Sequence, residues 1–361
     1  MLTLSYLKHI EDLLRARHNN DANFRLCHYF DLIAGTSTGA IIASALAVGH
    51  TVAFVQGKYR ELVGRVFKRG LLRWGVIRAK LDAQTLERAL QSEEVLGSQT
   101  TLGSPKLQTG LMVMTKRIDT SSPWPLTNNP RGTYFGPRPN STAIPNADFP
   151  LWRVVRASTA APHYFKPEHL KVATQDVNGK AQTVVGDFVD GGVSTANNPA
   201  LQALHVALFD GFKLRWQTGT NKLLLISVGT GRRNPKRKIP WFAAGHAVKA
   251  LVSMMDDCSA LVETQLQWMS VSDTAREIDR EIGTLANDHI ALQPLFTYQR
   301  YDVEFSTGWI QENLHTTYTE KVLQNLEKMD DPRNLEALEQ LGTHAAQRQI
   351  KGSHFPTAFN L

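Results

Sequence analysis

The stretch that most constrains the fold of this chain runs from residue 29 to residue 43 and reads YFDLIAGTSTGAIIA. It predicts an apolar strand, a turn in which Gly35 and Gly39 flank Ser37, and an alanine-rich helix that opens at Thr38. A Gly-x-Ser-x-Gly turn between a strand and a helix is typical of a nucleophile elbow, whose strained backbone projects the serine hydroxyl. Because the chain folds closely on itself there, we expect no room for a Cβ at either glycine.

This turn favours a serine acyl hydrolase with Ser37 as its nucleophile. A helix that begins directly after the serine presents free N–H groups and the positive end of its dipole to an oxyanion formed there. We assign Gly35, Thr36, Thr38 and Gly39 to the elbow and to oxyanion support. The pentapeptide alone recurs by chance, so the prediction depends on the strand before it and the helix after it.

The composition limits the other possibilities. The chain has 361 residues, of which 42% are hydrophobic, which is enough for one large core. No run approaches the 18 apolar residues of a membrane span, and the first residues lack the pattern of a signal peptide. Cys27 and Cys258 are expected to be reduced core residues of a cytoplasmic protein.

A formal charge of +7 favours an anionic partner. We find no nucleic-acid motif, no Cys/His spacing typical of a metal site and no glycine loop typical of phosphate binding. The sequence therefore predicts no nucleic-acid partner, no metal and no cofactor.

Helical and extended patterns alternate along the chain. We expect helices over residues 4–17, 51–67, 81–91, 151–161 and 199–209, and strands over 26–34, 109–115, 183–189 and 222–228. Residues 121–150 are predicted to be irregular and to form a lid or a wall of the active site. The region from about residue 245 is predicted to be mostly helical, with a strand over 295–305 and no clear structure from 352. This order predicts an α/β fold with a mainly parallel sheet, helices on both faces and catalytic residues at the carboxyl ends of strands.

The general base is the second candidate residue. Asp190 ends the strand predicted over 183–189 and precedes Gly191 and Gly192. It could accept the serine proton directly if the two side chains lie within about 3 Å of each other. Asp-Gly-Gly is also typical of an ordinary turn, which is our interpretation of the similar Asp187. A Ser-His-Asp triad stays open as well, since the chain has 12 histidines.

Four segments, taken in order, resemble the patatin-like phospholipase family. They are Gly35–Gly39, Arg156–Phe165, Asp190–Gly192 and Leu223–Gly231. The resemblance implies a three-layer α/β/α fold over residues 1–310, followed by a helical extension over 311–361 that packs on it. It also implies that Ser37 and Asp190 form a Ser–Asp dyad without histidine, which cleaves phospholipids or other acyl lipids.

The chain departs from the family pattern at one place. The family carries an Asp-Gly-Gly-Gly-x-Arg-Gly loop before its first helix, and this loop forms the oxyanion hole. The sequence begins at Met1 about where that loop would end, so we expect the first strand to be absent. The loss of one oxyanion donor typically costs about 100- to 1,000-fold in rate, which makes a catalytically impaired lipid-binding homologue the alternative.

We favour the interpretation that Met1 is an internal methionine of a longer protein, because a sheet without its first strand would expose an apolar edge.

Three further segments complete the expectations. Residues 156–165 are interpreted as scaffold beside the site. His163 is interpreted as a loop-facing or core histidine and not as a catalytic residue. Basic and aromatic residues alternate over 58–80 and again over 232–242, a pattern that suits anionic membrane surfaces but is also common on solvated surfaces. The expected location is cytoplasmic, or peripheral at a membrane surface.

Overall fold

The strands form two sheets. The structure is a computed structural model and describes residues 1–68, 83–162, 164–178, 180–234, 246–328 and 331–360. The first sheet contains β1 (Leu32–Thr36), β2 (Gly110–Arg117), β3 (Ser122–Thr127), β4 (Glu168–Val177) and β5 (Lys180–Asp190). The second contains β6 (Leu224–Val228), β7 (Ser270–Val271) and β8 (Phe296–Tyr301). Neighbouring strands are parallel in β1–β2, β6–β8 and β7–β8, whereas β3 and β5 pair antiparallel with β2, and β4 pairs antiparallel with β5.

Helices cover both faces of the first sheet because its buried strands are apolar on both faces. Alternate side chains of β1 and β2, such as Leu32 and Met112, pack toward α6 (Ala200–Leu208). The side chains between them, such as Val113, pack toward α2 (Thr38–Ala47) and α5 (Leu151–Ser158). The expected three-layer α/β/α arrangement is confirmed.

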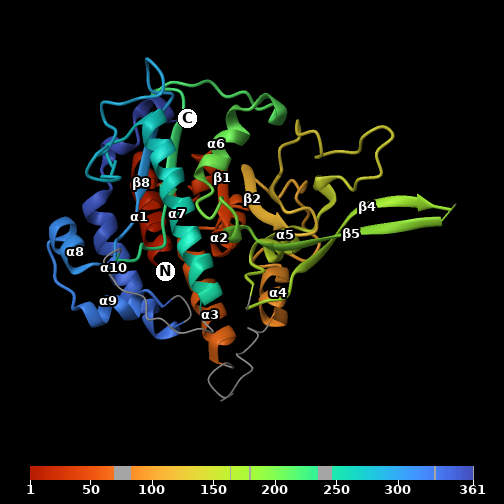
Figure 1. The fold of residues 1–361 in the computed structure, drawn as a ribbon, viewed down its shortest axis with the longest axis horizontal. Helices are drawn as coiled ribbons and strands as arrows, with labels where there is room; N and C mark the ends of the chain where they lie inside the picture. The colour runs from red at the N-terminus through yellow and green to blue at the C-terminus, as the bar shows by residue number, and fades with distance from the viewer. Residues whose placement is uncertain (69–82, 163, 179, 235–245, 329–330, 361) are drawn as a thin grey trace.

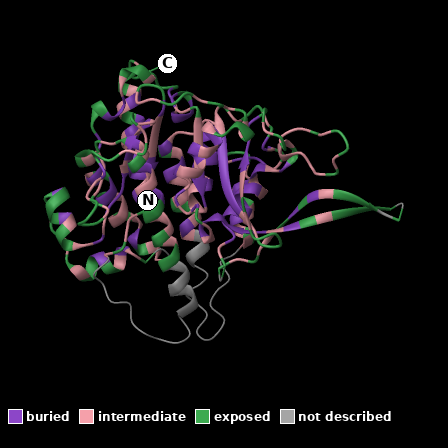
Figure 2. Cartoon of the chain, turned by 45° about the horizontal axis from the view of Figure 1, so that its top comes forward, coloured by how far each residue is buried: buried purple, intermediate pink, exposed green. Residues whose placement is uncertain are grey.

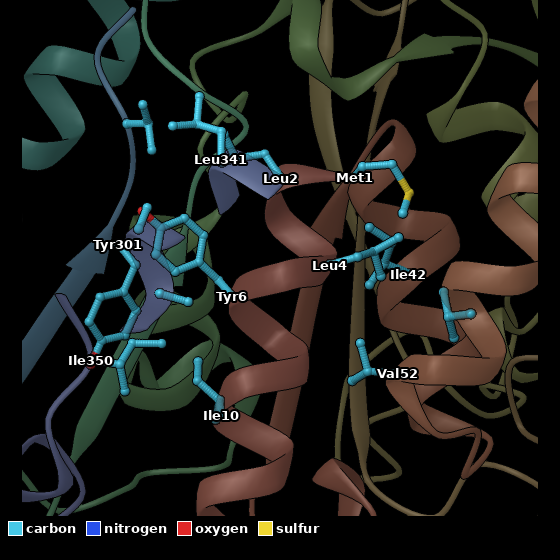
Figure 3. Packing of buried hydrophobic residues seen from close by; sticks show 14 of the residues in the cluster. Met1, Leu2, Leu4, Tyr6, Ile10, Ile42, Val52, Tyr301, Leu341 and Ile350 are labelled. Carbon is cyan, nitrogen blue, oxygen red and sulfur yellow. The ribbon is translucent and has the colours of Figure 1, made fainter. Parts of the chain in front are cut away.

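The second sheet is covered in the same way. Leu225 of β6 packs in the cluster that holds α6 and α7 (His246–Met269), while Ile226 packs toward α1 (Leu2–Arg17). Figure 3 shows α1 between two groups of neighbours. Tyr6 and Ile10 face Tyr301 and Ile350, and Leu4 faces the opposite side. Ile42 of α2 and Val52 of α3 (Val52–Lys68) lie on that opposite side. α1 therefore packs between the second sheet and these two helices.

The C-terminal helices lie against α1. They are α8 (Thr307–Leu314), α9 (Glu320–Leu326) and α10 (Leu335–Gln349). The Ser5 hydroxyl donates to the carbonyl of Glu339 at 3.1 Å, and the backbone of Leu2 lies against Gly342, where a side chain would collide. The absence of a Cβ therefore lets α10 approach α1 closely.

Most expected elements are present with shifts of a few residues at their ends. The strand expected over 26–34 begins only at Leu32, because residues 26–28 form a short 3-10 turn. The region 121–150 contains β3, an edge strand whose Pro123 and Pro125 need no partner on the outer side. The helix expected over 81–91 is α4 (Ala83–Gln91), and its expected first residues lie outside the described part.

β4 and its hairpin with β5 were not predicted. The hairpin extends away from the body of the molecule, as Figure 1 shows on the right, and its outer part is exposed on both faces (Figure 2). Residues 180–183, for example, are all exposed. The buried residues of β5 lie toward its end, at Gly186 and from Phe188 to Asp190, where the chain enters the core.

Two sheet edges meet helices but no strand. β1 and β6 each end their sheet, and within the described ranges no strand pairs with the outer edge of either one. Residues 32–34 and 224–226 are half-buried rather than buried. Cys27 and Cys258 are free thiols, buried and half-buried respectively. Among the described residues, no helix is long and apolar enough to cross a membrane.

Candidate active site

Ser37 lies where β1 ends and α2 begins. It is the residue before the first turn of α2, with φ of 56° and ψ of −126°. A positive φ is costly for any residue with a side chain and is expected at a nucleophile elbow. Ser37 is half-buried, and its backbone is held between the end of the strand and the start of the helix.

The two glycines of the elbow have different surroundings. A Cβ on Gly35 would lie 2.1 Å from the carbonyl oxygen of Gly39 and 2.7 Å from the backbone nitrogen of Ala40. Gly35 is therefore required by close packing, as expected. A Cβ on Gly39 would meet nothing within 4 Å, so the expectation of a collision there is wrong. The Gly39 carbonyl faces Gly35, whereas its own Cα faces open space.

Asp190 lies against Ser37. The Ser37 hydroxyl donates to Oδ2 of Asp190 at 2.5 Å, and the backbone N–H of Gly192 donates to Oδ1 at 2.7 Å. Asp190 is only 4% exposed. Burial raises the pKa of Asp190 to about 6, against the opposing effect of the hydrogen bonds from Ser37 and Gly192. A carboxylate with that pKa can exchange a proton with a substrate group near neutral pH.

Asp190 reaches Ser37 through an antiparallel strand rather than a parallel one. β5 pairs with β2 over only three residues, and Asp190 lies opposite Thr115. On the same edge of β2, Thr36 lies opposite the preceding residue, Met114, while β3 pairs along the other edge. β5 thus begins to pair with β2 where β1 leaves it, so Ser37 and Asp190 lie side by side along one edge of β2.

The turn after Asp190 is held by close packing and by the elbow itself. A Cβ on Gly191 would lie 2.4 Å from the carbonyl oxygen of Met114, so only glycine fits. A Cβ on Gly192 would lie 3.1 Å from both Asp190 Oδ1 and Asn197 Oδ1, which leaves little space. The hydroxyl of Thr36 donates to the carbonyl of Ala196 at 2.8 Å. Thr36 therefore ties the elbow to the loop that follows Asp190.

The start of α2 offers donors to an anion at Ser37. Thr38 and Gly39 are its first two residues, whose N–H groups have no carbonyl four residues earlier within the helix. The side chain of Thr38 forms a hydrogen bond with Tyr59 of α3. The sequence did not single out Tyr59, because helical spacing alone does not reveal which residue of another helix Tyr59 contacts.

The end of α5 touches both Ser37 and Asp190. The hydroxyl of Ser158, which is 0% exposed, accepts from the N–H of Ser37 at 2.9 Å and donates to the carbonyl of Met114 at 2.6 Å. The carbonyl of Ala160 accepts from the N–H of Asp190 at 3.1 Å. The segment 156–165 was expected to be scaffold beside the site, and these contacts place it there.

Other predicted residues lie apart or outside the described part. His163 lies outside the described residues, as do 69–82 and 235–245, which hold much of the two basic segments. Lys58 forms an ion pair with Glu94 at 2.7 Å, and Arg60 pairs with Glu339. Within the ranges that the structure describes, no group of three or more His, Cys, Asp or Glu side chains could hold a metal ion.

Comparisons with known proteins identify the family of this chain. The family "Patatin-like phospholipase" matches residues 2–204, more than half of the chain. The chain belongs to this family. Ser37, Asp190 and Ser158 all lie within the part that matches the patatin-like family.

Relatives with the patatin name are about a quarter identical to the chain over the aligned residues. Patatin-16 of Solanum tuberosum is 27% identical over 62% of this chain and 55% of its own length. "Probable inactive patatin-like protein 9" of Arabidopsis thaliana is 26% identical over 64% of this chain and 58% of its own. The chain thus spans little more than half the length of the curated relatives it matches. VipD from Legionella pneumophila has a TM-score of 0.35 at 13% identity, covering 96% of this chain and 64% of the other.

Proposed function

We propose that this protein hydrolyses fatty acyl esters of phospholipids or related acyl lipids through an acyl-enzyme on Ser37. The observation that carries the proposal is the hydrogen bond from the Ser37 hydroxyl to Asp190 at a strained strand-to-helix turn. A serine paired with a buried base, at the start of a helix, matches what nucleophilic acyl transfer requires. Membership of a phospholipase family supports a lipid ester as the substrate.

The reaction proceeds in two steps with Asp190 as the proposed base. As Ser37 Oγ attacks the acyl carbonyl, its proton passes to Oδ2 of Asp190, and the carbonyl oxygen becomes an oxyanion. The N–H of Thr38 and the positive end of α2 stabilise that oxyanion. The carbon–oxygen bond to the alcohol then breaks, and the alcohol leaves with the proton from Asp190. Asp190 next deprotonates a water molecule that attacks the acyl-serine, and Ser37 recovers its proton as the fatty acid leaves.

Reaction with a fluorophosphonate probe tests the proposal. Such a probe phosphonylates an activated serine, so we expect one probe per chain, attached to Ser37 and detected by mass spectrometry of the peptide. Ser37→Ala should abolish both labelling and hydrolysis of a phospholipid ester, while the far-ultraviolet circular dichroism spectrum stays unchanged. Full hydrolysis by Ser37→Ala would refute the proposal.

Two other functions predict different experimental results. The first is a catalytically impaired lipid-binding homologue, which is favoured by the word "inactive" in the name of one relative. Such a protein would bind liposomes but would not react with the probe. A soluble esterase with a Ser-His-Asp triad would lose activity on substitution of one histidine. In the described part of the chain the Ser37 hydroxyl bonds to Asp190 and to no histidine, which favours the dyad.

We also propose that residues 58–80 and 232–242 contact an anionic membrane, and that the protein acts in the cytoplasm, peripheral to such a surface. Basic side chains near a membrane contribute about 1 kcal/mol each. Because Lys58 and Arg60 already pair with acidic residues, the contribution must come from the rest of the segments. We expect sedimentation with liposomes that contain anionic lipid, weakened by salt. Equal sedimentation with neutral liposomes would contradict this proposal.

A further inference from the structure

The end of α5 contacts the backbones of both residues of the proposed dyad. Ser158 is the last residue of α5, and its hydroxyl bridges the N–H of Ser37 to the carbonyl of Met114. Two residues later, the carbonyl of Ala160 accepts from the N–H of Asp190. The backbones of nucleophile and base are thus anchored two residues apart on one short segment.

The hydrogen bond from Ser37 to Ser158 takes the place of a hydrogen bond between strands. Thr36 of β1 lies opposite Met114 of β2, and the chain leaves the sheet at the next residue. The N–H of Ser37 therefore has no strand partner, and a buried N–H without an acceptor costs free energy. The hydroxyl of Ser158 accepts a hydrogen bond from this N–H and donates a hydrogen bond to a backbone carbonyl of β2.

This bond acts on the peptide group that precedes the strained residue. Ser37 holds φ of 56°, and such a conformation persists only when the surrounding structure fixes it. The orientation of the backbone at Ser37 sets where its hydroxyl and the following N–H of Thr38 point. A side chain that fixes the Ser37 N–H therefore influences both the attacking atom and the oxyanion donor.

We propose that Ser158 is a positioning residue for Ser37: its buried hydroxyl holds the elbow in the reactive conformation without touching the substrate. The inference rests on the proposed function, because the reactive conformation is defined by attack from Ser37. The inference assigns a specific role to one hydroxyl of the segment 156–165, which is interpreted from the sequence only as scaffold.

Ser158→Ala tests the inference, with Thr159→Val as a matched control. Thr159 is the next residue, is 6% exposed, and its hydroxyl donates to the carbonyl of Arg156 without contact to the elbow. We expect kcat of Ser158→Ala to fall about 10- to 100-fold, a typical loss for misplaced reacting groups, while KM changes less than about twofold. The rate of fluorophosphonate labelling should fall by the same factor. Thr159→Val should change neither rate by more than about twofold.

Amide hydrogen exchange separates this inference from the proposed function. The Ser37 N–H should exchange faster in Ser158→Ala than in the unsubstituted protein, while amides of β8 and the same N–H in Thr159→Val should exchange at unchanged rates. This readout does not require activity, so a protein that fails to hydrolyse lipid still reports on the bond. Unchanged exchange, unchanged kcat, or an equal loss in both variants would overturn the positioning role.

Discussion

Asp190→Asn should abolish hydrolysis and at the same time stabilise the folded protein at neutral pH. An asparagine has the same shape, and its oxygen can still accept from the N–H of Gly192. It cannot take the proton of Ser37, so we expect kcat to fall about 100- to 10,000-fold, the usual contribution of a general base. Initial rates on a phospholipid ester measure this loss.

The gain in stability follows from the burial of Asp190. Burial raises the pKa of this carboxyl from 3.8 to about 6. The unfolded chain therefore loses its proton first as pH rises, and the folded state is progressively destabilised between those two values. Above pH 6 the cost is about 3 kcal/mol, since each unit of pKa corresponds to about 1.4 kcal/mol. Asparagine carries no charge and avoids this cost.

Urea unfolding at two pH values measures the effect. The stability difference between Asp190→Asn and the unsubstituted protein should be small near pH 4 and largest above pH 6, while hydrolysis by the unsubstituted protein rises over the same interval. Asp187→Asn is the control, because it lies on the same strand and its exposed side chain pairs with His169. A variant that stays active, or a stability gain at all pH values alike, would contradict the role of Asp190 as a buried base.

Gly35→Ala should disrupt the elbow. Its new methyl group would overlap the backbone of Gly39 and Ala40, at 2.1 Å from the Gly39 oxygen. Backbone atoms at the start of α2 cannot move without displacing the helix, so we expect a loss of about 3 kcal/mol or more in the free energy of unfolding. Fluorophosphonate labelling of Ser37 should be lost in the fraction that folds.

Gly39→Ala provides the control within the same pentapeptide. Because a Cβ there meets nothing within 4 Å, and alanine is the better helix former, we expect stability equal to or higher than that of the unsubstituted protein. Thermal unfolding followed by circular dichroism measures both variants. Equal melting temperatures for Gly35→Ala and Gly39→Ala would contradict the steric account of the elbow.

The elbow and the Asp190 turn beside it could be predicted from sequence because each is encoded locally. Ser37 is surrounded by strand, turn and helix signals within 15 residues, and Asp190 is followed directly by two glycines. The error at Gly39 shows the limit of that reasoning. Symmetry in the pentapeptide does not imply symmetry in space, since only one of the two Cα atoms faces a backbone.

The positioning contacts could not be predicted in the same way. Ser158 is separated from Ser37 by 121 residues, and its contact depends on how α5 docks on β2. β4 was not predicted for another reason. Residues 174–176 are exposed on a hairpin outside the core, so burial imposes no alternation of apolar and polar residues there.

The placement of Asp190 at the inner end of the hairpin makes strand register a condition for the contact of Asp190 with Ser37. Successive side chains of a strand point to opposite faces, so a slip of one residue between β5 and β2 would turn the carboxylate away from Ser37. Only three residue pairs fix that register, and the contact of Gly191 with the Met114 carbonyl limits how the strand can shift. The long exposed hairpin can therefore vary in sequence and length, provided that its last three residues keep their alignment.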